Sequence, residues 1–158
     1  MTSCGLYKWL CSPRGSGFVT VGPQAGWLEP RYAGWYSGDE PWQSIYGPPL
    51  RLADDARRFN VSPAWFDFVA AARAVEFIAE LGVDAINAHS IELANSFCDQ
   101  LGLAPANGAI VSVDSPHGGR LTAAGIAAAA RAGKVRLSFY LYNTVTDTER
   151  AADLLRTR

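Results

Sequence analysis

The chain has 158 residues, of which 49% are hydrophobic and 18% charged, and its formal net charge is -1. A chain of this size normally forms one domain, and this apolar content is sufficient for a buried core. The nearly balanced charge gives no sign of a nucleic-acid-binding surface or of a polybasic membrane anchor. Small molecules or other proteins are therefore the expected partners.

The cysteine content argues against disulfides and metal sites. Cys4, Cys11 and Cys98 form no CxxC pair, and the chain has two histidines. This pattern predicts a reducing, cytoplasmic environment and no zinc site. No apolar stretch has the length of a membrane span, and the first residues lack the charged and apolar regions of a signal peptide. We expect a soluble protein.

The N-terminal part predicts one short strand followed by a long irregular segment. Residues 18–21 alternate as a strand, which Gly22 and Pro23 end. Residues 26–60 are rich in Trp, Tyr, Pro and Gly and show no sustained periodicity. Irregular segments of this length are usually functional or interfacial. Their aromatic side chains could equally fill a local core.

Two helices are expected after this segment. Ser62 and Pro63 predict the start of the first, with the serine as its N-cap, and Gly82 its end. The second would begin with Asp84 as its N-cap and end at Gly102. The stripes expected to be buried are Trp65, Phe68, Val69, Ala72 and Val75 in the first helix and Ile86, Leu93, Phe97 and Leu101 in the second.

The C-terminal part predicts alternating strands and helices. Residues 109–113 and 134–142 have strand patterns, and residues 114–119 form the loop after the first. The alanine-rich residues 121–132 predict a helix that ends at Gly133. Thr146 and Glu149 have the spacing of a capping box for a last helix, through Leu155. From residue 62 onward, the pattern suits a small α/β domain with helices on one face of a sheet.

Lys8 and Arg136 are candidates for chemistry. Tyr7 and Trp9 flank Lys8, and apolar neighbours favour the uncharged amine, which is a nucleophile toward carbonyl groups. Arg136 lies on the polar face of its predicted strand, where a guanidinium can bind a carboxylate bidentately. Considered singly, a solvated lysine and a surface ion pair are the commoner roles of such residues. His89 and Cys98 are more often packing or surface residues.

Several segments together form a more specific pattern. They are YKWL at 7–10, PRGSGF at 13–18, AGWY at 33–36, YGPPLRLA at 46–53, ARRFNVSPAW at 56–65 and VRLSFYLYNT at 135–144. The pattern resembles the class V aminotransferase branch of fold-type I pyridoxal 5'-phosphate (PLP) enzymes, and most of all the PLP-dependent carbon-sulfur lyase of ergothioneine biosynthesis. The resemblance implies that residues 1–61 are the end of the large cofactor domain with its connecting loop. Residues 62–158 would be the small C-terminal α/β domain.

The resemblance also implies roles for individual residues. Lys8 would carry PLP and then take the substrate's α-proton as a general base. Tyr7 stands where the family often has a histidine on the cofactor phosphate, and its hydroxyl can donate. Gly5, in the place of a serine, offers its backbone amide. Ser62 would reach across a homodimer to the partner's phosphate, and Arg136 would bind the substrate's α-carboxylate.

Other parts of the family's cofactor site have no counterpart in this sequence. In the family, an acid on the pyridine nitrogen, an aromatic on the ring and a glycine-rich phosphate cradle all precede the lysine. We therefore expect the chain to be the C-terminal portion of such an enzyme. By itself, it should bind PLP weakly and turn over slowly or not at all.

The reaction is chosen from the residues of one loop. A cysteine desulfurase needs a mobile cysteine on the small-domain loop, and residues 114–120 contain none. An elimination lyase needs the lysine base, PLP and a carboxylate clamp. A lyase is therefore the leading interpretation, and the resemblance implies that it cleaves a hercynyl-cysteine sulfoxide to ergothioneine, pyruvate and ammonia. The alternatives are another class V enzyme (desulfurase, aminotransferase or epimerase) and a truncated, non-catalytic interaction or dimerisation module.

Overall fold

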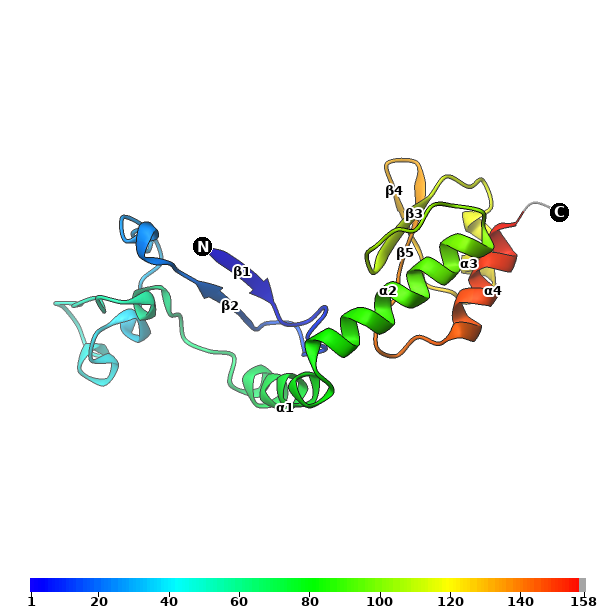
Figure 1. The fold of residues 1–158 in the computed structure, drawn as a ribbon. Coiled ribbons are helices and arrows are strands. Elements are labelled where there is room, and N and C mark those ends of the chain that lie inside the picture. Colours follow the sequence, from blue (N-terminus) through cyan, green and yellow to red (C-terminus); the bar gives the residue numbers. More distant parts are fainter. Residues whose placement is uncertain (157–158) are drawn as a thin grey trace. The chain divides into compact units, whose positions relative to one another are not determined.

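The computed structural model describes residues 1–156, which form two compact units (Figure 1). The N-terminal unit is Met1–Glu80, and the C-terminal unit begins at Leu81. The domain boundary expected between residues 61 and 62 is the border between the large and small domains of the longer enzymes that the chain resembles. It stays a prediction. No helix within residues 1–156 is long and apolar enough to cross a membrane.

The N-terminal unit begins with a two-stranded antiparallel hairpin. Strand β1 spans Thr2–Gly5 and pairs with β2, Gly17–Thr20. The strand expected at residues 18–21 is thus confirmed with a shift of one residue, whereas β1 was not expected. Gly17 lies opposite Gly5, and a Cβ atom on Gly17 would stand 2.8 Å from the Cys4 carbonyl oxygen. The close pairing of the two strands therefore requires glycine at this position.

Residues 26–60 are irregular, as expected, but they are tied together by hydrogen bonds. Short 3-10 turns occur at Trp35–Ser37, Pro41–Ser44 and Ala56–Phe59. The fully buried Ser37 links two of these regions: its hydroxyl donates to the Asn60 carbonyl at 2.7 Å and accepts from the Gly34 amide at 3.2 Å. The Ala53 amide donates to the Ser37 carbonyl at 3.0 Å. The segment therefore has a defined course without regular secondary structure.

Helix α1, Trp65–Leu81, is present, but two expectations about it were wrong. Its first turn is closed by a bond from the Phe68 amide to the Ala64 carbonyl, so Ser62 lies too early in the chain to be its N-cap. The stripe expected to be buried is exposed, with Trp65 at 64% and Val69 at 70%. Nothing within the N-terminal unit covers these side chains, whereas Gly82, with φ of 84°, ends the helix as expected.

The C-terminal unit combines a three-stranded sheet with three helices (Figure 1). The helices are α2 (Val83–Gln100), α3 (Gly118–Ala123) and α4 (Val145–Leu155), and the strands are β3 (Ile110–Val113), β4 (Ala129–Arg131) and β5 (Lys134–Ser138). The sheet is antiparallel in the order β3-β5-β4. It is therefore a mixed α/β unit, as expected.

One face of this sheet is buried against the helices. Alternate residues of β3 and β5 point into the core, where Phe97 of α2 packs with its ring centroid 5.4 Å from that of Phe139. The core cluster consists of Leu93, Ala94, Phe97, Cys98, Val111, Val113, Leu121, Val135, Leu137, Phe139, Ala151, Ala152 and Leu155. The opposite face of the strands is exposed, which leaves Arg136 accessible.

The prediction of a helix over residues 121–132 was wrong. Helix α3 ends at Ala123, and Ala129–Arg131 form β4 instead. Ala132 and Gly133 have φ of 49° and 77°, so they make a two-residue turn with positive φ that pairs β4 with β5. The tertiary pairing overrides the helix propensity of alanine.

Two helix caps in this unit also differ from the expectation. The N-cap of α2 is Gly82 and not Asp84. The capping box of α4 is formed by Thr144 and Asp147, two residues before the expected pair.

Candidate functional site

The loop between β1 and β2 presents Lys8 to solvent. The Cys11 amide donates to the Lys8 carbonyl at 3.0 Å, which closes a tight turn, and Cys11 adopts a φ of 52°. The Leu6 amide donates to the Ser16 carbonyl at 3.2 Å, and the Ser12 amide donates to the Leu6 carbonyl at 3.1 Å. These bonds hold the backbone on either side of the turn, while the Lys8 side chain remains exposed.

Two cations lie close to the ring of Tyr7. The Lys8 Nζ is 5.5 Å from the ring centroid and the Arg14 Cζ is 4.9 Å from it. Both distances are within the range of cation–π attraction. An amine, a phenol and a guanidinium are thus gathered on one loop, and the Arg14 contribution was not expected from the sequence.

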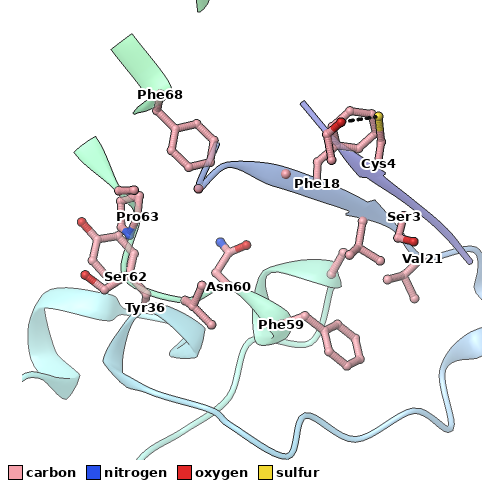
Figure 2. A pocket seen from close by; sticks show the side chains of 17 residues that line it. Ser3, Cys4, Phe18, Val21, Tyr36, Phe59, Asn60, Ser62, Pro63 and Phe68 are labelled. Carbon is pink, nitrogen blue, oxygen red and sulfur yellow. Dashed lines mark hydrogen bonds between the residues drawn. The ribbon is translucent and has the colours of Figure 1, made fainter. Parts of the chain in front are cut away.

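A cavity of about 690 Å³ lies elsewhere in the N-terminal unit, on the β1–β2 hairpin (Figure 2). One side is formed by hairpin residues that include Cys4 and Phe18, and Phe68 of α1 also lines it. Polar atoms come from Asn60 and Ser62 at the end of the irregular segment. Most of its lining is apolar, as Figure 2 shows.

The cavity is lined by some of the residues expected to hold the cofactor and not by others. Ser62, which was expected to reach the phosphate of a partner chain, lines it together with Gly5, whereas Lys8 and Tyr7 do not. Tyr36 and Asn60, which also line it, were not singled out from the sequence. Both lie within segments that carry the resemblance, at 33–36 and 56–65, but no role was assigned to either residue.

Arg136 belongs to the C-terminal unit. It stands in the middle of β5, opposite Ser112 of β3 and Ala129 of β4. Its side chain is on the exposed face and makes no ion pair with a described residue. The guanidinium is thus available to a carboxylate, and the roles expected for Arg136, Lys8, Tyr7 and Ser62 remain predictions.

His89 and Cys98 are engaged in the packing of the C-terminal unit. The His89 Nε2 lies 3.1 Å from the Asn143 carbonyl oxygen, to which it can donate. Cys98 is 2% exposed in the core, and burial raises the pKa of its thiol. Within residues 1–156, no three His, Cys, Asp or Glu side chains lie close enough together to hold a metal ion.

Comparison with solved structures identifies the fold. The complex of the cystine C-S lyase C-DES with its reaction product cysteine persulfide has a TM-score of 0.80 and 19% sequence identity, over 96% of this chain and 44% of that one. The apo cysteine desulfurase of Thermococcus onnurineus NA1 has a TM-score of 0.79 and 17% identity, over 96% and 45%. A lysine-to-alanine variant of C-DES, with glycine covalently linked to the PLP cofactor, has a TM-score of 0.79 and 19% identity, over 96% and 44%.

These matches define the class of fold and its extent. The chain has the α/β fold of the part of these enzymes that it matches, and it spans less than half of their length. No protein-family model matches the sequence, and a search of curated proteins gave no match. The similarity thus confirms the fold expected from the sequence motifs and leaves the reaction to be argued from the site.

Proposed function

We propose that the chain is the C-terminal portion of a PLP-dependent enzyme of the class V aminotransferase fold that cleaves carbon–sulfur bonds. The observation that supports this most is the exposed amine of Lys8 on a tight turn, in a chain with the fold of a cystine C-S lyase over 96% of its residues. The related C-DES variant carries PLP. An exposed primary amine is the group that an aldehyde cofactor requires.

The donor set of the Lys8 loop suits the cofactor. The Lys8 Nζ would hold the aldehyde carbon, while the Tyr7 hydroxyl beside it can donate to a phosphate oxygen. When bound, PLP withdraws electrons from the substrate's α-carbon. Lys8, once released, would take the α-proton at its Nζ, and the Arg136 guanidinium would bind and orient the substrate's α-carboxylate.

The residues of the C-terminal unit favour elimination over sulfur transfer. Residues 114–120 include no cysteine to receive sulfur. Cys98 is buried and its pKa is raised, so its thiol is a poor nucleophile and is closed to a partner. We infer a lyase acting on a cysteine conjugate, with a hercynyl-cysteine sulfoxide as substrate. Elimination would break the Cβ–S bond and release aminoacrylate, which hydrolyses to pyruvate and ammonia, together with a sulfenic acid. A two-electron reductant such as a thiol would then convert the sulfenic acid to ergothioneine and water.

A second candidate function is an interaction or dimerisation module. The large side chains of α1 support it, because Phe66 is 91% exposed and Trp65 64%. Apolar surface of this kind marks a protein contact site. A homodimer would cover such side chains and could bring Ser62 to the partner's cofactor phosphate. Sedimentation of the purified chain measures whether it self-associates.

The products distinguish the possible reactions. The protein is purified from cells in its native assembly and incubated with a cysteine sulfoxide conjugate. The amounts of pyruvate and alanine released are then measured. A lyase releases pyruvate, whereas a desulfurase releases alanine. We expect pyruvate from the wild-type protein and none from Lys8→Ala, with Lys134→Ala as the control. Alanine as the main product would contradict the lyase assignment.

A further inference from the structure

Arg14 has a position that the proposed chemistry does not yet use. Its Cζ lies 4.9 Å from the centroid of the Tyr7 ring, to which Lys8 is also close. Neither Arg14 nor Lys8 makes an ion pair with a carboxylate of residues 1–156. By contrast, Arg57 and Arg73 each lie within 4.0 Å of a carboxylate. The two cations near Tyr7 thus share a ring and lack an acidic partner.

The loop backbone fixes this arrangement. The bond between the Leu6 amide and the Ser16 carbonyl brings the two arms of the loop together, with Tyr7 on one arm and Arg14 on the other. Gly15 has a φ of 116°, and the carboxylate of Asp67 from α1 lies against the place where its Cβ would be. Although Asp67 lies against Gly15, it makes no ion pair with Arg14.

An anion is the partner that this cluster lacks. A guanidinium offers a planar fork of N–H donors that matches a phosphate, and it can stack on an aromatic ring while its edge donates. The phenol of Tyr7 adds one O–H donor beside it. A phosphate dianion would also neutralise the two neighbouring positive charges.

We propose that Arg14, together with the Tyr7 hydroxyl, binds the phosphate of the phosphorylated aldehyde that Lys8 captures. This inference rests on the proposed function, because it requires Lys8 to be the amine that takes the aldehyde. In that step the Lys8 Nζ bonds to the aldehyde carbon, and the carbonyl oxygen leaves as water. Arg14 would give the β1–β2 loop a phosphate contact of its own, in addition to the contact expected from Ser62. Arg14 thereby gives the loop a preference for a phosphorylated aldehyde over the free aldehyde.

The sequence provides an internal control for the test, because Lys8 and Lys134 are the two lysines of the chain. The full chain is incubated with PLP or with pyridoxal, the lysine adducts are reduced with cyanoborohydride, and each lysine's labelling is measured by peptide mass spectrometry. We expect a higher ratio of PLP to pyridoxal labelling at Lys8 than at Lys134. Arg14→Ala should lower the Lys8 ratio about tenfold, as expected for losing a charge-assisted hydrogen bond.

Matched variants separate phosphate binding from general charge. Arg31→Ala removes an exposed cation from the same unit and should leave the Lys8 ratio unchanged. Arg14→Lys keeps the charge without the planar fork and should give an intermediate ratio. Tryptophan fluorescence of each variant checks that the N-terminal unit is folded.

The possible outcomes distinguish a failure of the role of Arg14 from a failure of the role of Lys8. If the Lys8 ratio is unchanged in folded Arg14→Ala and Arg14→Lys, Arg14 does not bind the phosphate, although selective labelling of Lys8 would still support the proposed function. If both aldehydes label Lys8 no better than Lys134, the role of Lys8 fails, and the inference about Arg14 fails with it.

Discussion

Replacement of Ser37 by alanine tests how the irregular segment is held beside the cavity. The hydroxyl has no exposed surface and makes one hydrogen bond to the Asn60 carbonyl and one to the Gly34 amide. Each bond contributes about 1 kcal/mol, and more where the remaining group is left without a partner. We therefore expect Ser37→Ala to lower the free energy of unfolding of the N-terminal unit by about 2 kcal/mol.

Tryptophan fluorescence measures this unit selectively, because all five tryptophans lie within residues 1–80. In a urea titration, the midpoint should fall with an unchanged slope. Ser44→Ala is the matched control: its hydroxyl donates to the Glu40 carbonyl at 3.2 Å in an exposed setting, so the change should stay within about 0.5 kcal/mol. Equal stability losses in the two variants would refute the reasoning from burial.

Two further predictions concern the C-terminal unit. In the active assembly, Arg136→Ala should raise the KM for an amino-acid substrate about 10- to 100-fold and leave the absorbance spectrum of the cofactor intact. The control Arg131→Ala should change neither. An unchanged KM in Arg136→Ala would reject the role of Arg136 in binding the carboxylate. The pKa of the Asp147 carboxyl lies below its ordinary value of 3.8, mainly because the Thr144 amide donates to it. The ionised carboxylate therefore stabilises the fold above that value, and the contribution is lost as the pH falls through the lower folded-state pKa. Thermal melts should show Asp147→Asn less stable than wild type at about pH 6, with the difference shrinking as the pH falls below the ordinary carboxyl value of 3.8. A difference that does not change with pH would contradict the cap assignment.

The sequence predicted the elements that have a strong alternating or helical pattern. Strand β5 was expected because Val135 and Leu137 alternate with polar residues, and both are buried in the structure. Leu93 and Phe97 were likewise expected on the buried face of α2. In these elements the local conformational preference and the tertiary packing favour the same structure, so the sequence pattern is sufficient to predict the element and its buried face.

Two failures have physical causes that the sequence pattern does not contain. The alanine-rich run favours a helix locally, but the positive φ values of Ala132 and Gly133 and the pairing of Ala129 with Arg136 create a hairpin. The stripe of α1 is apolar as expected, yet periodicity shows which face is apolar and not what covers it. Trp65 consequently remains exposed in this chain.

The candidate site was only partly visible in the sequence. Lys8 and Tyr7 were singled out by their motif, whereas the place of Arg14 near Tyr7 depends on how the loop closes. Asn60 was missed because its relation to the cavity is created by the course of an irregular segment. Sequence patterns therefore indicated the amine and the neighbouring phenol, but not Arg14 or Asn60.

The central claim is that Lys8 is the amine that holds the cofactor, and absorbance spectroscopy tests it most directly. The purified chain is titrated with PLP to concentrations high enough to overcome the weak binding expected of this chain. We predict an absorbance band of the lysine adduct for the wild-type chain and for Lys134→Ala, and its loss in Lys8→Ala. A band that persists in Lys8→Ala, or that depends on Lys134, would contradict the account.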